Sequence, residues 1–228
     1  MRTTQFLLLC WLAFAARAEA AEFRALVIVG YADVIYSDLS VNPGDWYRSR
    51  RLLPLANAIE TGIRSHLTAA ELHESAPGEF ISADGQVEVV LKAATLLCPQ
   101  ETWAASSSLR PCRQQIEHSR DLLWFVENHV HEFDELIYIG HSRHGSGLAF
   151  GPFTPDFTWK PRFYNSHDIG RLKKIYMASC KADEYYAPYL RKHFQFDGLT
   201  GAVDWESQML PAVLRELSQI LRSRPQLY

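Results

Sequence analysis

The sequence predicts an α/β protein in which a mostly parallel sheet is covered by helices on both faces. Short, continuous apolar runs occur at several points along the chain, and segments with helical apolar spacing lie between them. Strands buried on both faces have such unbroken apolar runs, because helices cover both sides of a parallel sheet. The chain has 228 residues, so we expect a leader over residues 1–20 and a single domain over residues 21–228.

Five segments are expected as strands. The first, Ala-Leu-Val-Ile-Val-Gly, is apolar throughout and is bounded by glycine, which is typical of a strand buried on both faces. The others are shorter and have the same character, the last being the weakest. The expected strands are residues 25–30, 87–91, 136–139, 175–178 and 199–203.

Three segments between or after these strands have apolar residues at helical spacings of three and four. Pro54 and Pro211 each lie near the expected start of a helix, where the missing N–H costs little. The apolar positions are Leu52, Leu55, Ile59 and Ile63; Ile116, Leu123, Val126 and Val130; and Leu210, Val213, Leu214, Leu217, Ile220 and Leu221.

Residues 1–20 have the pattern of a cleaved secretory signal. Arg2 precedes an apolar run over 6–15, and small residues follow with an Ala-x-Ala pattern at 16–18 or 18–20. About ten apolar residues are too few to span a bilayer, which needs roughly 20. We therefore expect a secreted or periplasmic protein with no membrane partner once the leader is removed.

Composition is that of an ordinary globular domain, with 47% apolar and 21% charged residues. The net charge is −3, and removing two arginines and one glutamate with the leader makes it −4. A weakly acidic composition does not predict the basic surface that binds nucleic acid or anionic lipid. We expect no nucleic-acid partner.

The number of cysteines predicts one thiol without a disulfide partner. Cys10 lies in the leader, and Cys98 and Cys112 can close a short serine-rich loop as a disulfide in an oxidising compartment. Cys180 then has no partner. An odd cysteine in an exported protein is either a reactive nucleophile or an inert core residue, and the count does not choose between them.

Polar residues follow two successive expected strands. Gly-His-Ser-Arg-His-Gly-Ser-Gly occupies 140–147, and Ser-Cys-Lys-Ala-Asp occupies 179–183. Ligand sites in parallel sheets lie beyond the carboxyl ends of the strands. If the two strands are neighbours, a histidine and Cys180 reach one crevice. Cysteine catalysis requires this combination, together with backbone N–H groups for an oxyanion.

These two segments resemble the caspase–legumain–separase clan of cysteine peptidases. Leu-Ile-Tyr-Ile-Gly-His at 136–141 is similar to the clan's strand that ends in histidine, and Ile-Tyr-Met-Ala-Ser-Cys at 175–180 is similar to the strand that delivers its nucleophile. The resemblance covers roughly residues 23–203. It implies a caspase-like fold, with a helix after the cysteine, and endopeptidase activity on peptides or proteins without a cofactor.

The resemblance also implies the role of each residue. Cys180 attacks a carbonyl as thiolate, and a histidine protonates the leaving group. His141 has the clan's spacing from the strand, whereas His144 has the clan's following glycine; we favour His141 and keep both as candidates. The oxyanion hole is formed by the N–H of Cys180 and that of Ser142 or Gly145, depending on which histidine is used. Lys181 beside the nucleophile is expected to be an ordinary exposed lysine.

Two other functions remain open. Gly-His-Ser-Arg-His at 140–144 is close to the Gly-x-Ser-x-Gly elbow of α/β-hydrolases, with Ser142 as nucleophile, although its fifth residue is histidine. A catalytically inactive, caspase-like binding protein is the other alternative. A metal site is not expected, because His129 and His131 are two apart on an expected helix and face different directions.

Two further segments bear on the substrate. In the clan, the loop after the first strand contributes to a charged specificity pocket; here it spans 31–51 and holds both signs of charge, so it does not define a preference. The aromatic segment 150–164 either walls a substrate cleft or packs on the domain as a hydrophobic lid. The charged residues of the first loop are Asp33, Asp38, Arg48, Arg50 and Arg51.

Overall fold

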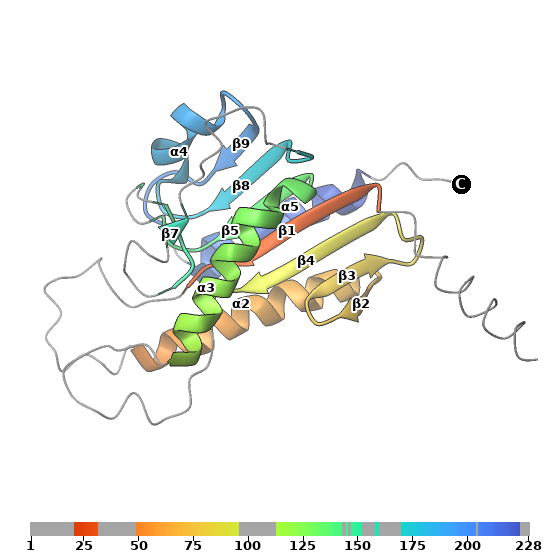
Figure 1. Cartoon of the computed structure of the whole chain (residues 1–228), viewed down its shortest axis with the longest axis horizontal. Coiled ribbons are helices and arrows are strands. Elements are labelled where there is room, and N and C mark those ends of the chain that lie inside the picture. Colours follow the sequence, from red (N-terminus) through yellow and green to blue (C-terminus); the bar gives the residue numbers. More distant parts are fainter. Residues whose placement is uncertain are drawn as a thin grey trace, which may run out of the picture.

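A seven-stranded sheet forms the centre of the protein (Figure 1), and its strands run in the order β2-β3-β4-β1-β5-β8-β9. The computed structural model describes residues 21–31, 49–95, 113–142, 145, 147–151, 158–159, 170–203 and 205–223. The expected leader and the cysteines of the expected disulfide, Cys98 and Cys112, lie outside these residues.

The five strands β4, β1, β5, β8 and β9 pair in parallel, and a hairpin adds β3 and β2 in antiparallel fashion. A second, two-stranded sheet pairs β6 with β7. The bounds are β1 Phe23–Val29, β2 Leu72–Ala76, β3 Glu79–Ser82, β4 Val87–Ala93, β5 Glu135–Ile139, β6 Leu148–Ala149, β7 Thr158–Trp159, β8 Lys174–Ala178 and β9 Gln195–Gly198.

Four of the five expected strands are confirmed as β1, β4, β5 and β8, but the fifth was placed wrongly. The strand is Gln195–Gly198, and the expected segment 199–203 is the loop after it. β9 lies at the edge of the sheet and buries a single large side chain, that of Phe196. An edge strand of this kind lacks the continuous apolar run that identified the others.

The β2–β3 hairpin was not expected from the sequence. Its turn contains Pro77 and Gly78, and Gly78 has a φ of +78°. A side chain at residue 78 would place its Cβ 2.5 Å from the backbone oxygen of Leu91. Glycine is therefore required by both the left-handed backbone and the close approach of β4.

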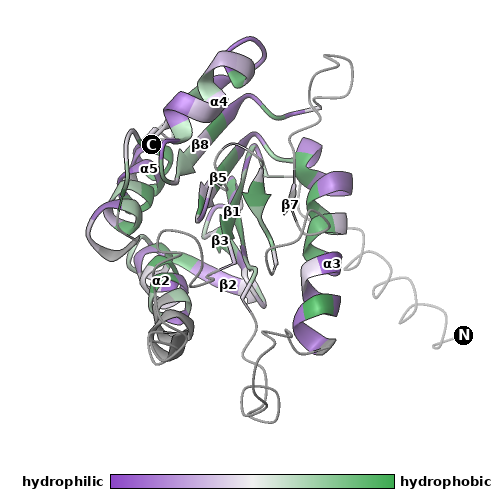
Figure 2. Ribbon diagram, turned by 90° about the vertical axis from the view of Figure 1, so that its left-hand side faces the viewer, coloured by the Kyte–Doolittle hydropathy of each residue, from purple (hydrophilic) through white to green (hydrophobic). Residues whose placement is uncertain are grey.

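Helices cover both faces of the sheet, as the fold class requires. In Figure 2, α3 lies on one side of the sheet, and α2 and α5 lie on the other. The three expected helices are confirmed as α2, α3 and α5. The bounds are α2 Ser49–Ala69, α3 Arg113–His129, α4 Ala182–Leu190 and α5 Leu210–Arg222, with short helical turns η3 at Val130–Glu132 and η6 at Trp205–Met209.

Each face of the sheet has its own apolar core. Ile59 and Ile63 of α2 pack with Val213 and Leu217 of α5 against one face. Side chains of α3 and α4, including Val126 and Leu190, pack against the other. Strand residues alternate between the two cores, as the two-residue period of a strand requires. Within the described residues, no helix is long and apolar enough to cross a membrane.

Replacing Leu217 by alanine tests the packing of α5. Leu217 is fully buried, so Leu217→Ala is expected to lower the free energy of unfolding by about 2–5 kcal/mol through lost apolar contact and the cavity left behind. Denaturant titration measures the change. Gln219→Ala is the control, because Gln219 is exposed on the same helix and its loss should cost under about 0.5 kcal/mol. Equal effects would contradict the packing.

Candidate active site

The two segments expected to carry chemistry follow neighbouring strands. β5 and β8 are parallel partners, with Ile139 opposite Ala178. The last bond of this ladder joins the Gly140 N–H to the Ala178 carbonyl at 3.1 Å. His141 and Cys180 each come two residues after the last pair. Both residues therefore follow the carboxyl ends of neighbouring strands, which lie about 4.8 Å apart.

The strand residues that precede the two candidates share one core. Ile139 and Ala178 belong to the core under α2 and α5, and Cys180 packs against that same core. His141 and Cys180 are both half-buried. The predicted cysteine and the predicted histidine thus both follow neighbouring strands at one edge of the sheet.

Cys180 lies in a sharp turn between β8 and α4. The next residue, Lys181, has a φ of +53°, a left-handed conformation that few non-glycine residues adopt. Cys180 is a free thiol. Val203 contacts its sulfur at 3.5 Å through both backbone groups, the N–H as donor and the carbonyl as acceptor.

The loop over 199–203 holds this turn in place. The Lys181 N–H donates to the Gly201 carbonyl at 2.7 Å, and the Asp183 N–H donates to the Leu199 carbonyl at 3.2 Å. Together with the contacts of Val203, these bonds tie the cysteine turn to the segment after β9. The segment mistaken for a strand is therefore a wall of the candidate site.

Two buried tyrosines hold the histidine segment. The Tyr138 hydroxyl donates to the His141 carbonyl at 2.9 Å and accepts the Ala149 N–H at 3.0 Å. The Tyr186 hydroxyl, from α4, donates to the Ser142 carbonyl at 2.6 Å. The second bond links the histidine segment directly to the helix that follows Cys180. The sequence analysis missed both tyrosines; the phenol of Tyr138 in an otherwise apolar buried strand was the available signal.

The predicted oxyanion donors differ in their hydrogen bonds. Gly145 donates its N–H to the Ser142 carbonyl at 2.9 Å, so this group is already used within the loop. Within the described part of the chain, the N–H groups of Ser142 and Cys180 have no acceptor. This is the pair that the choice of His141 requires. His144 itself lies outside the described residues.

Other predicted residues are resolved only in part. Asp33, Asp38 and Arg48 of the predicted specificity loop lie outside the described residues, as do the side chains of Arg50 and Arg51, which fall in the first turn of α2. From the aromatic segment 150–164, Phe150 and Trp159 are buried and stack with ring centres 6.1 Å apart. These two rings belong to the apolar core that also contains side chains of α3 and α4.

The remaining candidates are Ser142, His129 and His131, and each lies in an ordinary structural environment. Ser142 is buried, and the next element after β5 in the described chain is the short strand β6, whereas an α/β-hydrolase elbow leads from a strand into a helix. His129 ends α3 and pairs with Glu132 at 2.7 Å, while His131 lies in η3. No group of three or more histidine, cysteine or acidic side chains among the described residues is placed to hold a metal ion.

Comparison with known proteins adds little to this geometry. No protein-family model matches the chain, and no curated protein does. Among solved structures, the chain is similar to a structure titled azoreductase AzrA, at a TM-score of 0.33 and 11% sequence identity, over 88% of this chain and 100% of that one. At this TM-score the likeness carries no argument about function.

Removing the Tyr138 hydroxyl tests whether it positions the histidine segment. Tyr138→Phe leaves the His141 carbonyl and the Ala149 N–H without this partner in a buried place, which is expected to cost about 1–3 kcal/mol of folding free energy. Denaturant titration measures this cost, and amide exchange at residues 141–149 is expected to speed up. The control is Tyr189→Phe, because Tyr189 is exposed. Unchanged exchange would show that the hydroxyl does not order the segment.

Proposed function

We propose that the protein is a caspase-like cysteine endopeptidase with Cys180 as nucleophile and His141 as its acid–base partner. The single observation that carries this proposal is the parallel pairing of β5 with β8, because the segments that hold the two residues follow the carboxyl ends of these neighbouring strands. The resemblance of 136–141 and 175–180 to the clan's two motif strands is the second support. The substrate class is a peptide or protein, and no cofactor takes part.

The reaction follows from the groups at this edge. The Cys180 thiolate attacks the carbonyl carbon of the scissile peptide bond, and the carbonyl oxygen takes up negative charge. The N–H groups of Ser142 and Cys180 donate to that oxyanion. His141 in its protonated form gives a proton to the leaving amine as the C–N bond breaks, which leaves a thioester. Water, deprotonated by His141, then hydrolyses the thioester and restores the thiolate.

Several features of the turn support Cys180 over a purely structural cysteine. The strained backbone of Lys181 follows the sulfur directly, and strained residues cluster at functional sites. The first turn of α4, at Asp183 and Glu184, is acidic, which matches the helix dipole and stabilises a helix whose N-cap makes no side-chain hydrogen bond. The backbone conformation of Lys181 has a cost in local energy, whereas the acidic turn stabilises the helix that follows the thiol.

The choice of His141 over His144 rests on the two backbone donors. With His141, the oxyanion pair is Ser142 and Cys180, and neither N–H is used elsewhere in the described chain. With His144, the pair would need the Gly145 N–H, which donates to Ser142 within the loop. The proposal also includes export, carried by the signal-like residues 1–20, and leaves an inactive binding protein as the outcome of a failed test.

Replacing the proposed nucleophile is the decisive experiment. Cys180→Ala is expected to abolish cleavage of a mixed peptide library, scored as new termini by mass spectrometry, while the free energy of unfolding changes by no more than about 1 kcal/mol. In the folded, non-reduced protein, iodoacetamide is expected to label Cys180 alone and faster than a free cysteine at pH 7. A cleaved library with Cys180→Ala, or an inert Cys180, would remove the proposal.

Paired alanine variants separate the two histidines. His141→Ala is expected to lower the cleavage rate by at least about 100-fold, since positioned acid–base groups contribute 10²–10⁴-fold. His144→Ala is expected to retain most of the activity. The measurement is the initial cleavage rate on one peptide identified from the library, with circular dichroism melting curves for both variants. The opposite order of effects would assign the role to His144.

A further inference from the structure

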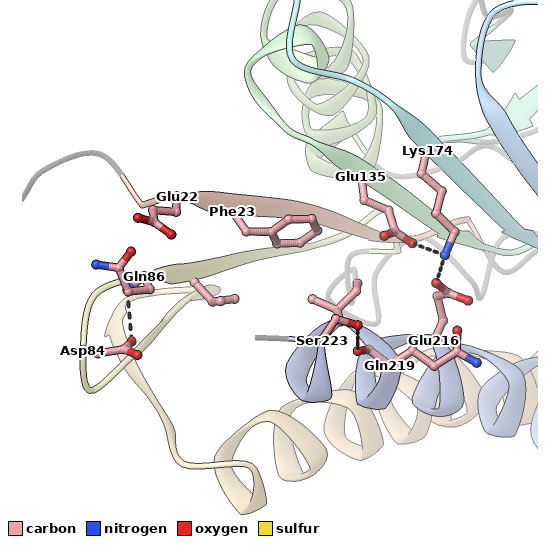
Figure 3. Close-up of a pocket in the computed structure, with 11 residues that line it drawn as sticks. Glu22, Phe23, Asp84, Gln86, Glu135, Lys174, Glu216, Gln219 and Ser223 are labelled. Atoms are coloured by element: carbon pink, nitrogen blue, oxygen red, sulfur yellow. Dashed lines mark hydrogen bonds and ion pairs between the residues drawn. The ribbon is translucent and has the colours of Figure 1, made fainter. Parts of the chain in front are cut away.

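A pocket lies at the other end of the parallel strands from Cys180. The amino ends of β1, β4, β5 and β8 and one side of α5 enclose a cavity of about 370 Å³ (Figure 3). Its walls combine carboxylates, one lysine and apolar side chains. The residues used below are Phe23, Asp84, Glu135, Lys174, Glu216 and Ile220.

In this cavity, one ammonium group forms ion pairs with two carboxylates. Lys174 Nζ forms an ion pair with Glu216 and lies 3.5 Å from Glu135 Oε1. The Glu135 side chain is almost fully buried, with an exposed fraction of 4%. Its Oε1 atom has no hydrogen bond to any residue that the structure describes, and its ion-pair partner Lys174 Nζ lies at 3.5 Å, beyond the usual hydrogen-bond length. A buried carboxyl oxygen that lines the cavity therefore has an ion pair but no hydrogen bond.

The charge of the cavity is unbalanced toward the negative. Glu216 faces Glu135 from α5 and Lys174 faces it from β8, while Glu22 and Asp84 add two more carboxyl groups to the lining. Burial raises the pKa of Glu135 to about 8, and Glu216 adds to the rise, while Lys174 offsets part of it. Without another cation, a proton on Glu135 therefore removes one of the excess negative charges.

The side chains that line the cavity indicate which class of ligand it could bind. Four carboxyl groups against one ammonium disfavour an anion. A metal ion is also disfavoured, because the described residues contain no group of histidine, cysteine or acidic side chains placed to hold one. Phe23 and Ile220 supply apolar surface beside the charges. A cation that carries hydrocarbon meets both parts of this lining.

We propose that this cavity binds a protonated organic amine, with the ammonium group donating to Glu135 Oε1 and the hydrocarbon body against Phe23 and Ile220. A volume of this size holds a small molecule rather than a polymer segment. When the ligand binds, the positive charge of its ammonium group stabilises the ionised form of Glu135, so the carboxyl group gives up its proton. Binding thus releases a proton at neutral pH and strengthens as the pH rises toward 8. This site is independent of the proposed cysteine chemistry.

Calorimetric titration of the whole protein with benzylamine tests the site, and benzyl alcohol is the neutral probe of matched shape. Benzylamine is expected to bind saturably at pH 7.5, with several-fold tighter binding at pH 8 than at pH 6.5, and with proton release seen as a difference between two buffers of unlike ionisation enthalpy. Benzyl alcohol is expected to bind at least about tenfold more weakly. No saturable benzylamine binding up to about 10 mM would overturn the proposal.

Variants separate the site from general charge effects. Glu135→Gln is expected to weaken benzylamine binding at least about tenfold and to remove the proton release, because the acceptor loses its charge. Glu127→Gln, an equal change of charge on the exposed face of α3, is expected to leave both unchanged. Ile220→Trp fills the apolar side of the cavity and keeps Glu135, and it too is expected to weaken binding. Equal affinities in all three would overturn the proposal.

The same glutamate makes the stability of the free protein depend on pH. Its pKa is raised in the fold from an ordinary value of 4.5 to about 8, so the folded state holds a proton that the unfolded state has lost in this window. The contribution of this proton to stability is therefore complete below pH 4.5 and is lost as the pH rises to 8, by up to about tenfold in the folding constant per pH unit. Glu135→Gln is expected to flatten this fall; an unchanged slope contradicts the buried, protonated carboxyl.

Discussion

The parallel pairing of β5 with β8 is the constraint on which the candidate active site depends. The two strands are buried on both faces, and each face belongs to a different core, so a shift of one residue would move every apolar side chain to the wrong side. The cores therefore fix the register, and the register fixes where the segments that hold His141 and Cys180 leave the sheet. In this protein, the energy that sets the positions of these two segments comes from apolar residues within the strands that precede them.

Much of the architecture was readable from the sequence because buried parallel strands are nearly pure apolar runs. β1, β4, β5 and β8 stand out for that reason, and their order along the chain predicts an α/β sheet. The edge strand β9 and the β2–β3 hairpin were missed or misplaced since each buries few side chains. Edge strands expose one side to water, so their composition approaches that of a loop.

The residues of the candidate site also differ in whether the sequence could predict them. Cys180 and His141 could be selected from the sequence because they follow recognisable strands. The hydrogen bonds of Tyr138 and Tyr186 could not, because they join residues whose distance in space depends on the loops. The ion group of Glu135, Lys174 and Glu216 was invisible for the same reason: its members come from two strands and a helix, and the third lies 42 residues from the second. Sequence patterns predict elements, whereas polar networks arise from their assembly.

The left-handed backbone at Lys181 has a consequence for how the chain can vary. Asparagine, aspartate and glycine tolerate a φ near +53° better than other residues, whereas valine, isoleucine and threonine are excluded by their branched Cβ. The tolerated substitutions at this position are therefore set by the shape of the turn rather than by charge. In a saturation library selected for folding, position 181 is expected to show a narrow spectrum of small polar residues and glycine, although its lysine side chain is exposed to solvent.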